Sequence, residues 1–254
     1  MLAYASRTGT RRNIASLRAA GWRMLVSATG AHRHEGMPYA VDNGAWSAFQ
    51  QQAPWDEVAF SRLVSSHGRS ADFVVVPDVV ADANASLRQT SEWLPRLAES
   101  LPIDGPKLLV AVQDGMAEQD VAPWIGGRVG VFLGGSTEWK LATMRRWGDL
   151  CSRRGVWYHV GRVNSAKRIR ACAESGATSF DGTSVTMYAD TLPPLDMARR
   201  EGTLDGPAWT DPPRDYAADA ATVAAELASY RDDDDVWVKA GALRAMLDAA
   251  RGCR

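Results

Sequence analysis

The sequence predicts an α/β protein, a (β/α)8 TIM barrel, and two observations carry this prediction. Short apolar runs typical of strands recur about eight times along the chain. The stretches between them have helical spacing, and most are followed by Gly or Pro. Strands that alternate with helices form a parallel sheet. About eight of them can close into a barrel, whereas an open sheet of that size would leave two unpaired edges.

The elements follow in order along the chain. Strands are expected where short runs of apolar, β-branched and aromatic residues occur, at residues 2–4, 24–27, 39–42, 73–76, 108–112, 129–133, 157–160 and 179–181. Helices are expected where apolar residues recur every three or four positions, at residues 55–66, 83–100, 141–154 and 165–175.

The chain is expected to be a single domain. Its 254 residues with 46% hydrophobic content suffice for one large core. Pro193-Pro194 and the segment 202–213 break the alternation, and residues 216–230 and 236–251 then read as two helices outside the barrel. We therefore expect a barrel over residues 1–200 and a C-terminal helical appendage over residues 201–254.

Composition excludes several classes of protein. No apolar run reaches the ~18 residues of a membrane span, and no signal peptide is recognisable, so no membrane association and a cytoplasmic location are expected. Three widely separated cysteines favour neither a disulfide framework nor a zinc site. The net charge of −1 does not by itself indicate a nucleic-acid-binding protein, although arginines cluster between residues 145 and 170.

Polar residues follow most of the expected strands, and in barrels of this kind the site is built at the carboxyl ends of the strands. The candidate site residues in strand order are Asp42, Asn43, Asp78, Gln113, Gly134, Gly135, His159, Gly161 and Asp181.

Two of these carboxylates follow apolar strand residues directly. Asp42 and Asp181 should therefore meet at the rim of a partly dry pocket, where burial and mutual repulsion separate their pKa values. Taken singly, an aspartate before Gly or Asn is most often a turn residue. As a pair, one carboxylate can act as a nucleophile while the other carries a proton. His159 can either line a sugar site or be a buried, hydrogen-bonded histidine.

The ordered set of strand ends resembles the tRNA-guanine transglycosylases and their DNA-modifying relatives, from about residue 39 to residue 186. The matching segments are Asp42-Asn43-Gly44-Ala45-Trp46, Pro77-Asp78-Val79-Val80, Val112-Gln113-Asp114-Gly115, Gly130-Val131-Phe132-Leu133-Gly134-Gly135 and Gly176-Ala177-Thr178-Ser179-Phe180-Asp181. The resemblance implies that Asp181 is the covalent nucleophile and Asp42 the general acid/base. It also implies that Asp78, Gln113 and a backbone amide of Gly134 or Gly135 bind the guanine.

These residue types suit that chemistry. Displacement of guanine from C1′ passes through an oxocarbenium-like sugar, which a carboxylate such as Asp181 can trap. The leaving base needs a proton and the incoming base must lose one, which calls for a second carboxyl group such as Asp42. Guanine offers N1–H and an amino group as donors and O6 as an acceptor. An aspartate, an amide and a backbone N–H can match them.

The chain also departs from the family pattern. The zinc motif of the tRNA enzymes is absent, so no metal and no cofactor are expected, and Thr183-Ser184-Val185-Thr186 stands where the family has Pro-Thr-Arg. These elements help the family to grip tRNA, so the expected partner is DNA, with a free 7-deazaguanine base as co-substrate. The resemblance is to the DNA-modifying branch, whose phage-encoded members insert bases such as 7-cyano-7-deazaguanine. A phage-encoded protein would act in the host cytoplasm.

Three alternatives remain open. The same scaffold could exchange guanine in tRNA, or it could act as a guanine-specific N-glycosidase in which water resolves the adduct. A barrel without activity that binds modified nucleic acid belongs to another class, because a fold alone fixes no reaction.

Overall fold

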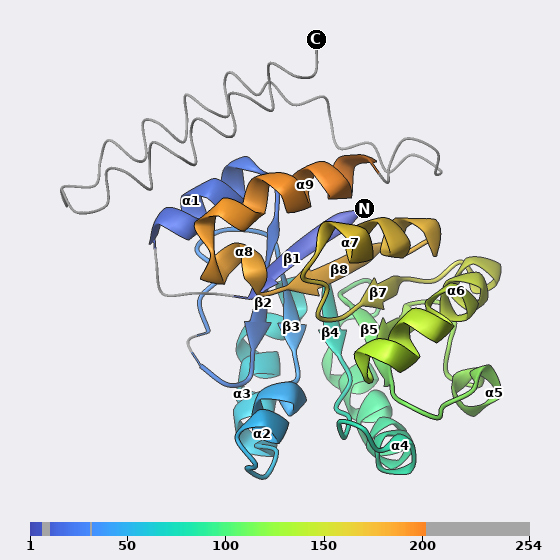
Figure 1. Cartoon of the computed structure of the whole chain (residues 1–254). Helices are drawn as coiled ribbons and strands as arrows, with labels where there is room; N and C mark the ends of the chain where they lie inside the picture. The colour runs from blue at the N-terminus through green and yellow to red at the C-terminus, as the bar shows by residue number, and fades with distance from the viewer. Residues whose placement is uncertain (7–10, 31, 202–254) are drawn as a thin grey trace.

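The computed structural model describes residues 1–6, 11–30 and 32–201, and its strands form one closed parallel barrel in the order β1 to β8 (Figure 1). The strands are β1 Leu2–Ser6, β2 Arg23–Ser27, β3 Tyr39–Asp42, β4 Phe73–Val75, β5 Lys107–Val112, β6 Val129–Leu133, β7 Tyr158–Val160 and β8 Ser179–Gly182. The predicted fold class, a (β/α)8 barrel, is confirmed. The C-terminal appendage expected over residues 201–254, with its helices at 216–230 and 236–251, lies outside the described residues apart from residue 201.

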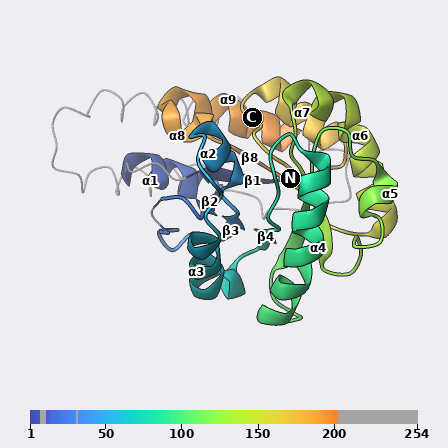
Figure 2. The ribbon, with the colours of Figure 1, turned by 90° about the horizontal axis from the view of Figure 1, so that it is seen from below.

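The helices cover the barrel on the outside. They are α1 Arg11–Ala19, α2 Ala45–Gln50, α3 Glu57–His67, α4 Ala83–Ser100, α5 Glu118–Val121, α6 Thr137–Arg154, α7 Ala166–Glu174, α8 Ser184–Met187 and α9 Leu192–Glu201, with the short 3-10 turns Gly68–Ser70 and Ala189–Thr191. Figure 2 shows the longer helices arranged around the strands. Within the described residues no helix combines the length and apolar character that crossing a membrane requires.

Helix starts follow capping residues that periodicity alone does not reveal. The α6 helix begins at Thr137 rather than at residue 141, because the side chain of Ser136 accepts a hydrogen bond from the backbone N–H of Trp139. The α3 helix begins at Glu57 because Asp56 caps it in the same way. The prediction for α4, residues 83–100, agrees with the structure at both ends.

Pro193-Pro194 was expected to break the pattern and instead opens a helix. Both prolines lie in the first turn of α9, where a missing N–H costs no intrahelical hydrogen bond and the fixed φ suits the helix. The second strand departs from the regular repeat, since residues 28–30 and 32–38 contain no helix between β2 and β3. The helices α1, α2, α5 and α8 were not predicted from the sequence.

The barrel interior is filled by side chains from alternate strand positions. The buried cluster inside it consists of Leu2, Tyr4, Leu25, Ala40, Phe73, Val75, Leu109 and Ala111, with Phe132 and Trp157 packed against it. A larger apolar cluster fills the space between strands and helices. Side chains alternate along a strand, so the residue two positions after an interior residue also points into the barrel.

Candidate active site

The inward-facing series continues into polar residues at the carboxyl ends of the strands. Asp42 lies two positions after Ala40, and Gln113 lies two positions after Ala111. The same spacing relates Trp157 to His159. These polar groups therefore lie at one end of the barrel, above its apolar filling, and the strand register pairs Ser27 with Asp42 and Tyr4 with Asp181.

Asp181 is buried, with 5% of its surface exposed, and one of its two oxygens is held. Oδ1 accepts a hydrogen bond from Nε2 of His159 at 3.0 Å and another from the backbone N–H of Arg162 at 3.2 Å. Oδ2 receives no hydrogen bond from the residues that the structure describes. Arg162 adopts a left-handed backbone with φ of 58°, which turns its N–H toward the carboxylate.

Asp42 is held in a parallel way. Its Oδ2 accepts hydrogen bonds from Oγ of Ser27 at 3.0 Å and from the backbone N–H of Gly44 at 3.1 Å, and Gly44 has φ of 82°. Oδ1 has no hydrogen-bond partner in the described part of the chain. Burial and then the nearby charge of Asp181 raise the pKa of Asp42 to about 6. Each carboxylate thus has one fixed oxygen and one unoccupied oxygen, and the two charges interact.

The remaining polar candidates form a hydrogen-bonded network beside this pair. Asn43 donates to Oδ1 of Asp78 at 2.7 Å, and Gln113 donates to Oδ2 of Asp78. Oε1 of Gln113 accepts from the backbone N–H of Gly135 at 2.9 Å. Burial raises the pKa of Asp78, although both amide donors oppose that change. The structure therefore brings together the groups that the sequence selected for recognition of a base.

Not all of these groups are equally available to a ligand. The backbone N–H of Gly134 is engaged by the carbonyl of Val112 at 3.0 Å, as the sheet requires. Asn43 donates through its amide nitrogen to the carbonyl of Val76 and accepts through its oxygen from the N–H of Ala45, so it links α2 to the residue that follows β4. Further hydrogen bonds remain possible for Asp78, Gln113 and, after a rotation of Gln113, the N–H of Gly135.

His159 is completely buried, and both of its ring nitrogens contact protein groups. Gly161 lies beside it, where an added Cβ would be 2.6 Å from the ring of Phe132 and 3.4 Å from Oδ1 of Asp181. Only glycine therefore fits here without displacement of a neighbour.

Two cations near the carboxylates were not among the predicted site residues. Arg162 places its guanidinium 3.8 Å from the ring centre of Trp46 and donates to the carbonyl of Gly135. Lys140 is 5% exposed and donates to the carbonyl of Gly161. Burial and then the charge of Arg162 lower the pKa of Lys140 to about 8, whereas Asp181 opposes that change.

Some of the site residues that were not predicted could have been found from the sequence. Arg162 directly follows Gly161 at a strand end, and Ser27 ends the second strand, so the strand-end rule alone would have selected both. Lys140 lies within α6, where no pattern distinguishes it from a solvent-exposed helical lysine.

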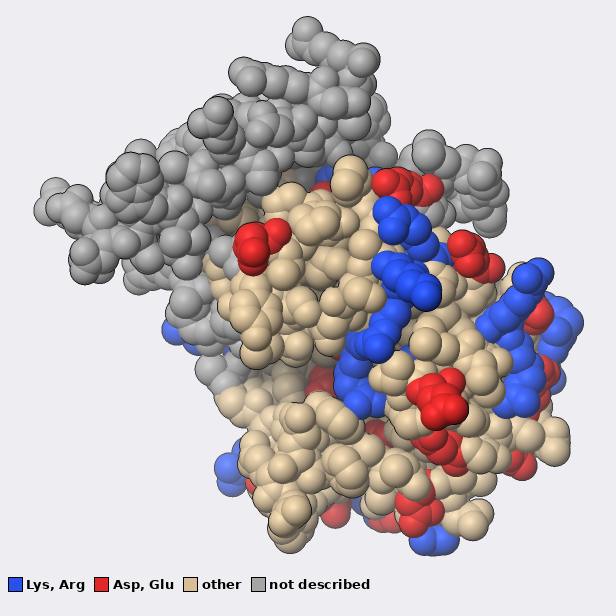
Figure 3. Space-filling view, in the orientation of Figure 1, with Lys and Arg blue, Asp and Glu red and all other residues tan. Residues whose placement is uncertain are grey.

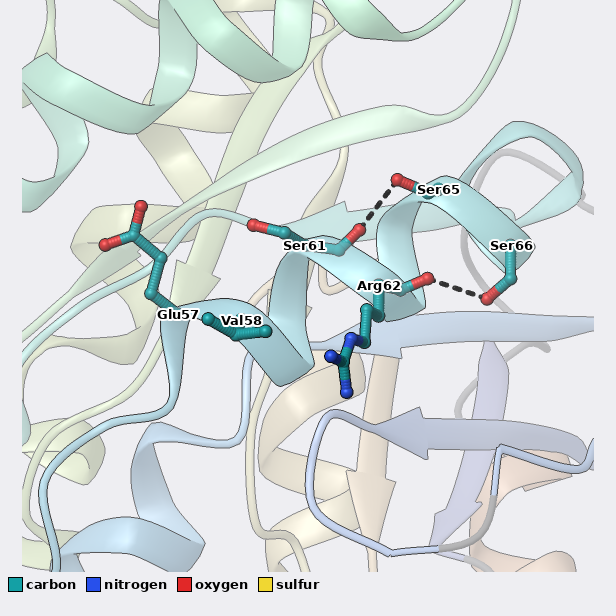
Figure 4. Close-up of a pocket in the computed structure, with 6 residues that line it drawn as sticks. All are labelled: Glu57, Val58, Ser61, Arg62, Ser65 and Ser66. Carbon is teal, nitrogen blue, oxygen red and sulfur yellow. Dashed lines mark hydrogen bonds between the residues drawn. The ribbon is translucent and has the colours of Figure 1, made fainter.

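Other parts of the described chain offer no competing centre of this kind. No group of three or more His, Cys, Asp or Glu residues in the described ranges is arranged to hold a metal ion. A hollow on α3, shown in Figure 4, is lined by Glu57, Val58, Ser61, Arg62, Ser65 and Ser66. Its serines Ser65 and Ser66 donate to carbonyls of the same helix, at Ser61 and Arg62. It contains none of the strand-end residues.

The chain was compared with protein-family models and with curated proteins. No protein-family model matches the chain, and no curated protein matches it. The chain is a (β/α)8 barrel with a carboxylate pair at the carboxyl ends of its strands. Many enzymes share this fold, and they carry their sites at this end of the barrel.

Proposed function

We propose that this chain is a base-exchange transglycosylase that replaces guanine in DNA by a 7-deazaguanine base such as 7-cyano-7-deazaguanine. The observation that carries the proposal is the placement of two carboxylates, Asp42 and Asp181, at the same end of the barrel. Burial, and then the charge of Asp181, raises the pKa of Asp42 to about 6. A carboxyl group with that pKa is protonated in about a tenth of the molecules at pH 7. It can therefore both donate and accept a proton near neutrality. The resemblance at the strand ends supplies the substrate class.

In the first step, Oδ2 of Asp181 forms a bond to C1′ of the deoxyribose while the bond from C1′ to N9 of guanine breaks. The electron pair of that bond leaves with the base, and Asp42 in its protonated form supplies the proton that the leaving base needs. Two features support this division of roles. Asp181 is near two cations, Lys140 and Arg162, and its charge acts to raise the pKa of each. Asp42, with its raised pKa, is the carboxyl group that carries a proton in part of the molecules near neutral pH.

In the second step, the ionised Asp42 removes the proton from N9 of the incoming 7-deazaguanine. The nitrogen attacks C1′, the ester bond to Asp181 breaks, and the carboxylate is regenerated. Asp42 is then protonated again, so the cycle closes without any further reactant.

Recognition of the base is assigned to the network around Asp78. An ionised Asp78 accepts from N1–H and the amino group of guanine, and the N–H of Gly135 or of Gln113 donates to O6. Trp46 provides an aromatic face near the carboxylates, on which the guanidinium of Arg162 stacks in this structure. A flipped-out base that displaces this guanidinium would stack on the same face.

A nucleic-acid partner is also supported by the charged surface over α6 and α7. Figure 3 shows a stripe of Lys and Arg side chains that crosses the region of α7, and a second group over α6. Exposed cations on these helices include Lys167 and Arg170 on α7 and Arg145 and Arg146 on α6. Arg170 also forms an ion pair with Glu201. Cations on one face supply the sequence-independent attraction to phosphates that DNA binding needs.

The test follows exchange of the base directly. Duplex and single-stranded DNA with labelled guanine are incubated with the protein and 7-cyano-7-deazaguanine, and both the released guanine and the digested nucleosides are quantified. Intact-mass measurement after acid quench detects the covalent adduct. We expect release and incorporation to be equal, and both to be lost in Asp181→Asn and Asp42→Asn.

The controls separate the alternatives. Asp149→Asn, an exposed aspartate on α6, should leave the rate unchanged. Release of guanine without added deazabase would assign an N-glycosidase, and exchange in tRNA but not in DNA would assign the tRNA reaction. Undiminished exchange in Asp181→Asn would overturn the assignment of the nucleophile.

A further inference from the structure

We propose that His159 is a positioning residue, held as the Nε2–H tautomer by Ser179 and Trp157, that fixes Oδ1 of Asp181 and leaves Oδ2 as the attacking oxygen. The proton arrangement is independent of the reaction, whereas its use in catalysis rests on the proposed function. Neither Lys140 nor Arg162 can replace this contact, because Lys140 donates elsewhere and Arg162 offers only its backbone N–H to Asp181.

Four side chains from two neighbouring strand regions form one continuous chain of hydrogen bonds. Nε1 of Trp157 lies 2.7 Å from Oγ of Ser179, which lies 2.8 Å from Nδ1 of His159. Nε2 of His159 lies 3.0 Å from Oδ1 of Asp181. The pairing of His159 with Ser179 in the register of β7 and β8 accounts for this order, since alternate residues of each strand point into the barrel.

The direction of each hydrogen bond follows from its donors. An indole N–H can only donate, so the oxygen of Ser179 accepts from Trp157 and its single hydrogen remains for Nδ1 of His159. A carboxylate oxygen accepts, so in the contact with Oδ1 of Asp181 the hydrogen lies on Nε2 of His159. The neutral imidazole has one N–H, and the chain therefore fixes it at Nε2.

Aromatic neighbours disfavour the charged form of this histidine. The ring of Phe132 stacks on it with centroids 4.9 Å apart, and Phe73 and Tyr4 contact it at 4.9 Å and 5.8 Å. Burial among these rings lowers the pKa of His159, although Asp181 opposes that change. A neutral N–H donor orients Asp181 without placing a further positive charge against it. The carboxylate therefore keeps its nucleophilic character.

The consequence concerns which oxygen reacts. With His159 and the N–H of Arg162 both on Oδ1, the unoccupied Oδ2 forms the bond to C1′ as the bond to the base breaks. Oδ1 becomes the carbonyl oxygen of the ester and keeps both donors. These donors polarise the ester and favour its cleavage when the incoming base attacks.

The first measurement is structural. Long-range proton–nitrogen NMR on the full chain reports the tautomer of each of the four histidines, and the spectrum of His159→Gln identifies the signals of His159. We expect a protonated Nε2 and an unprotonated Nδ1 from pH 6 to pH 8. Ser179→Ala removes the donor to Nδ1 and should raise the fraction of the Nδ1–H tautomer above that of the wild type, whereas Asp181 still favours a hydrogen on Nε2. A protonated Nδ1 or a charged ring in the wild type would overturn the proposal.

The second measurement is the rate of adduct formation at saturating DNA. His159→Leu removes the donor and should lower the rate about 10- to 100-fold with little change in KM, the range expected for one hydrogen bond to a charged group. His159→Gln places an amide N–H near the position of Nε2 and should restore most of the rate, whereas His159→Asn, whose amide reaches only the position of Nδ1, should not. Equal rates in His159→Leu and the wild type would overturn the positioning role.

The two failures are distinguishable. A wild type with the Nε2–H tautomer but no adduct on any DNA would remove the proposed function and support the hydrogen-bond chain. A wild type that forms the adduct while carrying the other tautomer would do the reverse.

Discussion

Replacement of Asp42 by Asn should make the folded protein more stable at neutral pH while it abolishes base exchange. Both hydrogen bonds to Asp42 reach the same oxygen, Oδ2, from Ser27 and Gly44. An asparagine can place its amide oxygen there and keep both. What it removes is the partly buried charge next to Asp181, which is the unfavourable part of the wild-type arrangement.

The magnitude follows from the shift in pKa. Burial and Asp181 raise the pKa of Asp42 from 3.8 to about 6. A difference of about two pKa units corresponds to about 3 kcal/mol. Because the folded pKa is the higher one, the stabilising contribution of the protonated group is complete below pH 4 and is lost as the pH rises through 6. Asp42→Asn has no such dependence. Its free energy of unfolding should therefore exceed that of the wild type by about 3 kcal/mol at pH 8, by less at pH 5, and by almost nothing at pH 4.

Denaturant-induced unfolding of both proteins at pH 4, 5 and 8 measures this difference, and contributions from carboxylates that do not interact with Asp42 cancel in the comparison. Asp149→Asn serves as the control, since a change at an exposed position of α6 should stay within about 0.5 kcal/mol at every pH. In an Asp181→Asn background the gain from Asp42→Asn should shrink, because one cause of the raised pKa is gone. A variant no more stable than the wild type at pH 8, or a difference that does not vary with pH, would refute the reasoning.

Two further predictions concern the neighbours of the carboxylates. Gly161→Ala should cost about 1 to 3 kcal/mol of stability and slow adduct formation, because its Cβ would be 2.6 Å from the ring of Phe132. Gly126→Ala, which would meet no atom within 4 Å, is the matched control in the same unfolding experiment, and equal losses in the two variants would contradict the packing argument. Lys140 should titrate with a pKa of about 8 when its side-chain signals are followed by NMR, and Asp181→Asn should lower that value because the charge of Asp181 raises it. A midpoint near that of an exposed lysine, or no response to Asp181→Asn, would show that Lys140 is neither desolvated nor close to Asp181.

The fold was predictable because strand and helix periods are properties of local sequence. The alternation of short apolar runs with helical stretches was sufficient to predict a closed parallel barrel, and the strand ends fell within a residue or two of the observed ones. Helix starts were less predictable where a single capping hydrogen bond sets them, as at Ser136. The first turn of α9 was misread because a proline pair has opposite meanings inside a helix and at its start.

The site was predictable as a set of residues but not as a set of contacts. Strand-end position selected Asp42, Asp78, Gln113 and Asp181, and the two-residue period explains why Asp42, Gln113 and Asp181 face the barrel interior. Asp78 lies in the loop after β4, outside that period. It could not show that Asp78 and Gln113 bond each other, or that His159 receives its proton arrangement from Ser179. Those facts depend on side-chain directions across strands distant in sequence. Lys140 reaches Gly161 from an outer helix, and no local pattern encodes such a contact.

The parallel between the two carboxylates has a consequence for Arg162. Each carboxylate is held by one side chain and by one backbone N–H from a residue in the left-handed region, Gly44 for Asp42 and Arg162 for Asp181. Glycine adopts that conformation freely, whereas a residue with a Cβ pays about 1 to 2 kcal/mol. The backbone contact alone would be made at lower cost by glycine. The arginine at this position is therefore explained by its side chain, which connects Gly135 to Trp46 across the strand ends. Arg162 thus holds Oδ1 of Asp181 through its backbone N–H, and its guanidinium covers the Trp46 face on which we propose that the base stacks.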